Sequence, residues 1–324
     1  MSADADITRY ERTNEMREFY ISSSQKTEKL HCMIWEPENS PKAVVQISHG
    51  MVEHIARYAE FAEYLTKRGY VVAGHDHLGH GKTAKTETDL GFFARKNGHN
   101  IVIKDIHLVH KAVQKQYPGI PYILLGHSMG SYFARKYITI YGNEIDGVIL
   151  SGTGNQPFAV AEAGYLISNL LVFFKGDHYR SRLMHSMMFG SFAKSVKERE
   201  TDFDWLGKDK EKVAAYMADP FCQFKFTAGA DRDFMKIITE LCKKKRFDRI
   251  PKDLPVFLCA GEKDPVGSMG KGVVQVYETF GEIGMKNVTM KLYENDRHEI
   301  LNEMDRDVVY QDMADWIEKI CCKE

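Results

Sequence analysis

One serine in this 324-residue chain stands in a pattern typical of a nucleophile. Ser128 is the centre of Gly126-His127-Ser128-Met129-Gly130, which follows the apolar run Ile123-Leu124-Leu125 and precedes a helix-forming stretch. On a sharp strand-to-helix turn a serine projects its hydroxyl clear of the sheet, and the two glycines let the backbone cross the turn without clashes. The first amides of the next helix would favour an anion beside this serine. The alternative is a Gly-Ser turn that only ends a strand.

The base that would activate Ser128 is expected later in the chain. A serine hydroxyl needs a base within hydrogen-bonding reach and an acid that orients the base. In sheets of this kind the chain order is serine, then acid, then histidine. The histidines after Ser128 are His178, His185 and His298, and only His298 follows a predicted strand, at 288–293. His298 is therefore the predicted base, and a histidine of a surface loop is the alternative.

The predicted acid is Asp264, which follows the predicted strand 256–260 at its carboxyl end. In open parallel sheets, sites form at that end of the strands. Three other acids are rivals: Glu262, Asp253 and Asp296. Asp253 precedes the strand and so lies at the opposite edge of the sheet. Asp296 shares a short loop with His298, where a role in the local turn is favoured.

Two backbone amides are predicted to hold the oxyanion of a tetrahedral intermediate. One is the N–H of Met129, directly after the nucleophile. The other is the N–H of Met51, in the loop that follows the predicted strand 44–48. Gly50 permits a close backbone approach there. The residues expected to contact a substrate are His49, Gly50, Leu166, Leu170 and Met187.

Short β-rich runs alternate with amphipathic helical runs through most of the chain. Such alternation predicts an α/β fold with a mostly parallel sheet that helices cover on both faces. The expected strands are 44–48, 70–73, 122–125, 147–151, 256–260 and 288–293. The expected helices are 55–67, 101–116, the stretch after Ser128, 273–280 and 307–320.

The segment from about 152 to 252 has a different composition, since it is rich in Met and Phe and lacks strand alternation. It lies between two predicted core strands, and its stretch 158–174 is mostly apolar. We therefore expect residues 153–252 to form a helical cap over the site, and residues 1–152 with 253–324 to form the core. A helical excursion that only pads the sheet is the alternative.

Composition restricts the class of protein. Apolar residues make up 44% of the chain, which is enough for a large core, and the net charge of −1 indicates no nucleic-acid partner. The first twenty residues carry no apolar run of signal-peptide length, and the six cysteines are not spaced as a disulfide framework. We therefore expect a cytoplasmic protein with reduced thiols. The sequence leaves the oligomeric state open.

Five segments in this chain order resemble a known family: His-Gly-Met-Val-Glu-His at 49–54, Gly-His-Asp-His-Leu-Gly-His-Gly-Lys at 74–82, Gly-His-Ser-Met-Gly at 126–130, Gly-Glu-Lys-Asp at 261–264, and His298. Together they resemble the α/β-hydrolase fold, specifically its monoacylglycerol lipase and lysophospholipase-like branch, which includes serine aminopeptidase-type hydrolases. The resemblance spans about residues 30 to 320. One departure is Ser131, where the family often has glycine.

The resemblance implies a mostly parallel, eight-stranded type of sheet with an inserted helical cap. It implies that Ser128, Asp264 and His298 form a triad, with Met51 and Met129 as oxyanion donors. It also implies that the apolar face of the cap touches membranes transiently and admits an acyl chain.

A histidine-rich loop imitates a metal site. His75, His77 and His80 are spaced as in the H-x-H-x-D-H loop of metallo-β-lactamase-type hydrolases, where three histidines at this spacing can hold zinc. Gly79 stands where that loop has its aspartate, and no later set of residues supplies the other ligands. We therefore expect no metal and no organic cofactor.

The sequence predicts a cytoplasmic carboxylic-ester hydrolase with peripheral membrane contact. Its expected substrates are monoacylglycerols, lysophospholipids or smaller acyl esters. An aminopeptidase, an amidase or an acyltransferase would use the same triad, and a receptor that only binds a ligand in the pocket is a more distant alternative.

Overall fold

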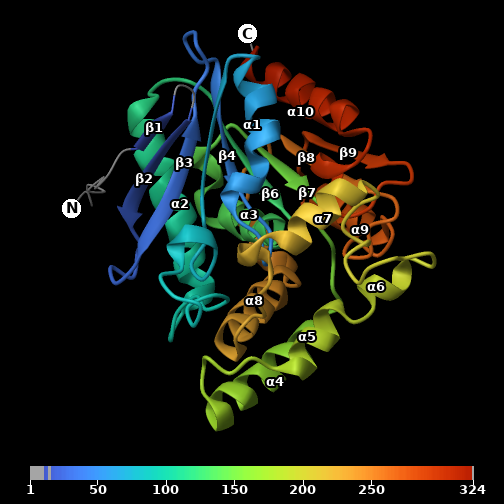
Figure 1. Cartoon of the computed structure of the whole chain (residues 1–324). Helices are drawn as coiled ribbons and strands as arrows, with labels where there is room; N and C mark the ends of the chain where they lie inside the picture. The colour runs from blue at the N-terminus through green and yellow to red at the C-terminus, as the bar shows by residue number, and fades with distance from the viewer. Residues whose placement is uncertain (1–10, 14–15, 323–324) are drawn as a thin grey trace.

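The centre of the protein is one nine-stranded sheet (Figure 1). This computed structural model describes residues 11–13 and 16–322. The strand order is β1-β2-β3-β5-β4-β6-β7-β8-β9, and all neighbours from β5 to β9 run parallel. The strands are β1 Glu11–Thr13, β2 Met16–Ser22, β3 Lys29–Trp35, β4 Ala43–Ser48, β5 Tyr70–His75, β6 Tyr122–His127, β7 Gly147–Ser151, β8 Val256–Gly261 and β9 Val288–Tyr293.

The predicted α/β fold class is confirmed, with one strand more than the eight that the resemblance implies. The sequence pattern does not predict β1, β2 and β3, which pair antiparallel at one edge. The reason is visible in β2, where Arg17 and Glu18 interrupt the apolar residues. An antiparallel strand with one face toward solvent carries such polar residues, unlike a strand in the middle of a parallel sheet.

Helices cover both faces of the sheet because successive side chains of each strand point to opposite sides. In β6, Leu124 packs into the larger core with α2, α3 and α9, whereas Ile123 and Leu125 pack into the core with α1 and α10. These helices are α1 Ala59–Thr66, α2 Gly98–Gln116, α3 Met129–Tyr141, α9 Lys271–Glu282 and α10 Arg306–Cys321. Short 3-10 helices are η1 Ile55–Tyr58, η2 Gly81–Thr83, η3 Gly142–Glu144, η4 Pro220–Cys222, η5 Lys244–Arg249 and η6 Ile300–Asn302.

Five helices lie between β7 and β8: α4 Phe158–Lys175, α5 Arg182–Phe189, α6 Phe192–Ser195, α7 Lys210–Ala218 and α8 Ala228–Leu241. Figure 1 shows α4 and α5 at the bottom of the molecule, with α8 between them and the sheet. α8 is buried along most of its length and packs against α2, α3 and α4. The division into a core and a cap at residues 152 and 252 stays a prediction.

Four histidines form a buried cluster between the sheet and the loop 49–54: His49, His75, His77 and His80. Burial lowers the pKa of His49 and His80 to about 3 and that of His75 to about 4. Both ring nitrogens of His75 are buried and have no hydrogen-bond partner among the described residues. His75 is therefore neutral in the folded protein near pH 7.

We predict that His75→Leu makes the protein less sensitive to mild acid. Because the folded pKa of His75 lies below its unfolded value of about 6.5, the unfolded chain takes up this proton first as the pH falls. The folded state then loses up to about 1.4 kcal/mol per pH unit between roughly pH 6.5 and 4 through this residue. Urea unfolding of the variant should show a smaller loss of stability from pH 7.5 to 5 than the parent.

The control for this measurement is His178→Gln, at a half-exposed histidine away from the cluster. It should leave the pH dependence of unfolding unchanged. Equal pH slopes for His75→Leu and the parent would contradict the prediction.

Candidate active site

Ser128 lies on a strained turn between β6 and α3. Its φ and ψ angles are 51° and −121°, in a region that a residue with a side chain rarely adopts and that costs about 1–3 kcal/mol. Three hydrogen bonds hold the turn. The Ser128 N–H donates to the carbonyl of Ser151 over 2.9 Å, and the N–H and hydroxyl of Ser131 donate to the Ser128 carbonyl over 2.8 and 2.6 Å. The hydroxyl of Ser131, at the position of the family's usual glycine, thus supports the turn.

Gly130 allows α3 to approach the sheet at this turn. A Cβ atom at Gly130 would run into the carbonyl oxygens of Ser48 and His49, at the end of β4. A Cβ atom at Gly126 would meet the carbonyl of Gly130 in the same way. The two glycines of the motif therefore set the distance between helix and strand, as the sequence predicts.

The structure brings Ser128, His298 and Asp264 into one hydrogen-bonded chain, from the ends of three different strands. The Ser128 hydroxyl lies 2.8 Å from Nε2 of His298, and Nδ1 of His298 lies 3.0 Å from Oδ2 of Asp264. Oδ1 of Asp264 accepts the backbone N–H of Val266 over 2.8 Å, which fixes the carboxylate. This geometry meets the requirement for a serine activated by an oriented base.

The surroundings of His298 favour its protonated form. His298 is only 2% exposed, and burial alone would lower its pKa. The charge and hydrogen bond of Asp264, together with the charges of Glu299 and Glu53, outweigh burial, so the pKa of His298 is raised above its ordinary value. The ring of His127 lies 4.9 Å away, and burial together with the charge of His298 lowers the pKa of His127 to about 4. His127 is therefore neutral and does not repel an imidazolium at His298.

Met51 and Met129, whose amides the sequence predicts as oxyanion donors, lie at the same cavity, and their donor role stays a prediction. Met129 is the first residue of α3, so its N–H has no carbonyl partner within the helix. Both methionines line the cavity beside Ser128. The N–H of Gly50 is not available there, because it donates to Oε1 of Glu53. An oxyanion at Ser128 thus has two candidate amide donors.

A cavity of about 750 Å³ opens beside Ser128, and its lining includes Gly50 and Met187, as predicted. Side chains from α4, α5 and α8 make most of it apolar: Val160, Ala161, Met184, Met188, Phe234, Met235 and Ile238. A cavity of this size and polarity is typical of sites for small ligands.

Three residues predicted to contact substrate lie elsewhere. Leu166 and Leu170 are 55% and 58% exposed and do not line the cavity, because α4 turns Ala161, Gly164 and Ser168 inward instead. His49 is fully buried beneath the loop, where its Nδ1 lies 2.8 Å from the carbonyl of Gly50 and its Nε2 accepts the N–H of His77. His49 supports the backbone of the loop and is shielded from the cavity.

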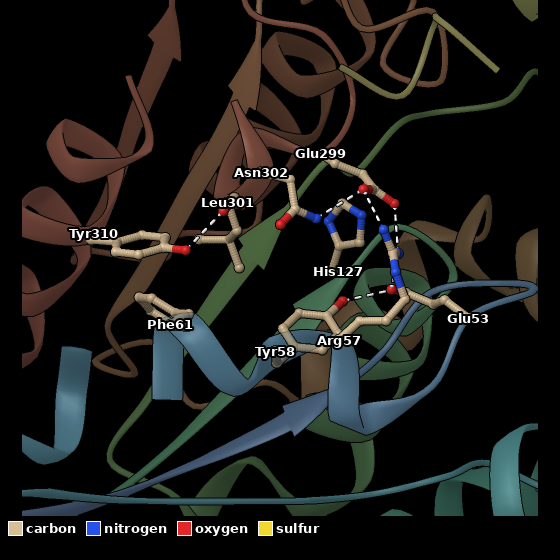
Figure 2. A pocket seen from close by; sticks show the side chains of 9 residues that line it. All are labelled: Glu53, Arg57, Tyr58, Phe61, His127, Glu299, Leu301, Asn302 and Tyr310. Atoms are coloured by element: carbon tan, nitrogen blue, oxygen red, sulfur yellow. Dashed lines mark hydrogen bonds and ion pairs between the residues drawn. The ribbon is translucent and has the colours of Figure 1, made fainter. Parts of the chain in front are cut away.

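A buried ion cluster that the sequence did not indicate lies behind His127 (Figure 2). Arg57 donates to Glu53 over 2.7 Å and makes two bonds of 2.7 Å to Glu299, which follows His298 in the chain. Burial alone would raise the pKa of Glu299. The charge and hydrogen bonds of Arg57 have the larger effect and lower this pKa to about 2. Arg57 thus joins the loop that carries Met51 to the loop that carries His298. The spacing Glu53–Arg57 (i, i+4) was the available signal in the sequence.

The histidines of the imitated metal loop make contacts inside the fold. Nε2 of His77 lies 3.0 Å from the Ser48 hydroxyl, and Nδ1 of His80 lies 3.0 Å from the carbonyl of Leu78. Asp76, which directly precedes His77, accepts N–H groups of Ile55 and Lys82 over 2.8 Å each. The absence of a metal cofactor stays a prediction.

A family model described as "Serine aminopeptidase, S33" matches residues 39–305. The chain belongs to this family. Among curated relatives, the monoacylglycerol lipase of Mycolicibacterium smegmatis is 26% identical over 285 residues, which is 88% of this chain and 91% of that protein. The human monoglyceride lipase is 26% identical over 300 residues, which is 89% of this chain and 86% of that protein.

Solved structures of esterases and lipases have the same fold. A carboxyl esterase from Bacillus coagulans superimposes with a TM-score of 0.88 at 31% identity, over 95% of this chain and 100% of that one. A yeast monoglyceride lipase superimposes with a TM-score of 0.72 at 23% identity, over 98% and 96% of the two chains. The chain is an α/β-hydrolase of the monoacylglycerol lipase-like branch.

We predict that Asp264→Asn lowers turnover and moves the pH profile. Because the charge of Asp264 raises the pKa of His298, the acidic limb of kcat/KM should lie above the ordinary histidine value in the parent and move to lower pH in the variant. The loss of an oriented tautomer should reduce kcat by about 10⁴. The measurement is kcat/KM for a soluble p-nitrophenyl ester between pH 5 and 9.

Glu262→Gln is the matched control, two residues away in the same turn. It should keep both the rate and the position of the acidic limb. An Asp264→Asn protein with parental turnover would contradict the assignment of Asp264.

Proposed function

We propose that this carboxylic-ester hydrolase cleaves long-chain acyl esters of the monoacylglycerol and lysophospholipid type through an acyl-enzyme on Ser128. One observation carries the proposal: the chain Ser128–His298–Asp264 faces a cavity of about 750 Å³ whose walls are mostly apolar. The curated relatives named monoacylglycerol or monoglyceride lipase support monoacylglycerols within this class.

The proposed reaction has two halves. In the first, Nε2 of His298 takes the Ser128 proton as the hydroxyl oxygen attacks the ester carbonyl. The amides of Met51 and Met129 stabilise the oxyanion, and the His298 imidazolium then gives its proton to the leaving alcohol. In the second half, His298 takes a proton from water as the water oxygen attacks the acyl-enzyme carbonyl. The bond between the acyl carbon and the Ser128 oxygen then breaks, the carboxylic acid leaves, and the Ser128 oxygen takes the proton from the His298 imidazolium.

The charges in the cavity favour an ester over a peptide. A substrate amine would need an available carboxylate, and the acidic residues that line the cavity are Glu53, Asp202 and Glu299. Arg57 already pairs with Glu53 and Glu299, and Asp202 lies 3.8 Å from Arg199. Glu162 and Asp177, the other candidates from the sequence, do not line the cavity.

We also propose that the outer face of α4 contacts a membrane surface, where the substrate would be taken up. Phe173 and Phe174 are 79% and 72% exposed. Within the described residues, α4 is the one helix long and apolar enough to span a membrane, with 18 residues, a mean hydropathy of 1.4 and only 17% of it buried. A helix that packs one face on α8 and exposes a broad apolar face suits a peripheral position on a bilayer. We propose a cytoplasmic protein with this peripheral contact.

The first test of the proposed function uses Ser128→Ala. This variant should lose hydrolysis of monoacylglycerols and p-nitrophenyl esters by at least about 10³-fold, and a fluorophosphonate probe should label the parent only. Across a series of esters, kcat/KM should rise from short to long acyl chains as the cavity fills. Full activity of Ser128→Ala would exclude the mechanism, and a strong short-chain preference would exclude the substrate class.

A second test addresses the membrane contact with the double variant Phe173→Ser and Phe174→Ser. Binding to phosphatidylcholine vesicles should fall by about tenfold or more, because each side chain loses roughly 1.5–3 kcal/mol of apolar burial. Hydrolysis of a soluble short-chain ester should stay unchanged. Val308→Ser, at a 51% exposed apolar residue of α10, is the control and should keep parental binding. Parental binding by the double variant would contradict the contact.

A further inference from the structure

The backbone of the loop that carries His298 is paired with a segment 90 residues earlier in the chain. We call residues 204–208 the brace segment; they lie within the predicted cap. The Glu299 N–H donates to the carbonyl of Leu206 over 2.7 Å, and the His298 N–H donates to that of Trp205 over 3.4 Å. The ring of Trp205 lies 5.2 Å from that of His298. The brace segment thus contacts both the backbone and the ring of the proposed base.

Side chains on both sides of His298 strengthen this pairing. Nη1 of Arg297 donates to the carbonyls of Asp204 and Gly207 over 2.6 and 3.1 Å. In the other direction, the Lys208 N–H donates to Glu303 over 2.9 Å. Every residue from 204 to 208 therefore makes a contact with the chain around His298.

Lys208 places a positive charge between two buried carboxylates. Its ammonium donates to Oδ1 of Asp296 over 2.7 Å and lies 4.0 Å from Glu303. The side chains of both carboxylates are fully buried, and the second oxygen of Asp296 has no hydrogen-bond partner among the described residues. Removing the ammonium would leave two buried carboxylates without a cation between them. Such a loss strongly destabilises the folded conformation of this loop.

We propose that Lys208 is a positioning residue that holds the His298 loop against the brace segment, so that Nε2 of His298 stays in reach of Ser128. This inference rests on the proposed function of Ser128 and His298. It also divides the predicted cap. The brace segment belongs with the loops that position the catalytic residues, although it lies within the predicted cap.

The expected effect of losing this contact is on turnover. A displacement of a base by about 1 Å costs up to about 10²-fold in rate, with little effect on a remote acyl-binding cavity. Lys208→Met should therefore lower kcat for p-nitrophenyl butyrate between about tenfold and 10²-fold and change KM by less than about twofold. Lys208→Arg, which keeps the cation, should regain most of the lost kcat.

Lys210→Met is the matched control. Lys210 pairs with Glu200 on the surface two residues further on, and the variant should keep parental kcat and KM. The rate of Ser128 labelling by a fluorophosphonate should follow kcat across all three variants, because labelling also needs an oriented His298.

Two outcomes would overturn the inference: parental kcat in Lys208→Met, or an equal loss in Lys208→Met and Lys208→Arg. If Lys208→Met does not fold, the double variant Lys208→Met with Asp296→Asn removes one of the two buried carboxylate charges that the lysine neutralises. Parental kcat in that folded protein would also overturn the inference. Failure of the proposed function would look different, since Ser128→Ala would then remain active and the probe would label no site at Ser128.

Discussion

The turn at Ser128 is the constraint on which the rest of the site depends. The backbone passes from β6 into α3 within one residue, and it does so only because α3 lies close enough for Gly130 to touch the end of β4. At this close approach Ser128 adopts a conformation that a residue with a side chain rarely takes. Bonds from Ser131 and to Ser151 offset the strain, and the bond to Ser151 exists only where β6 and β7 pair in the folded sheet.

The parallel sheet then determines which loops meet at Ser128. Strands β4, β6, β8 and β9 run parallel, so their carboxyl ends lie at one edge, and each of the following loops supplies one part of the site. No pair of these parts is adjacent in sequence. Bringing these loops together costs conformational entropy, and burial of apolar side chains on both faces of the sheet offsets that cost. A large core therefore accompanies a small group of reactive atoms.

The buried charged side chains around the His298 loop form ion pairs. Arg57 lies between Glu53 and Glu299, and Lys208 lies between Asp296 and Glu303. Buried charges are costly unless each has a partner with good geometry, and breaking one such pair costs more than the pair contributes. The two clusters flank the His298 loop. The proposed base therefore sits between two sets of ion pairs that resist displacement.

The sequence by itself determined the α/β class, the central parallel strands and the residues whose types permit hydrolysis, because turn chemistry, apolar periodicity and chain order are local properties. It did not determine which side of α4 faces the cavity, so Leu166 and Leu170 were predicted inside and lie outside. Apolar residues occur on most sides of α4, so its sequence pattern does not mark one buried face, and packing on α8 selects that face. The partners of Arg57 and Lys208 were decided in the same way, by the tertiary structure, because Glu299 and Asp296 lie 242 and 88 residues from them in the chain. Ion pairs over such separations have no local pattern.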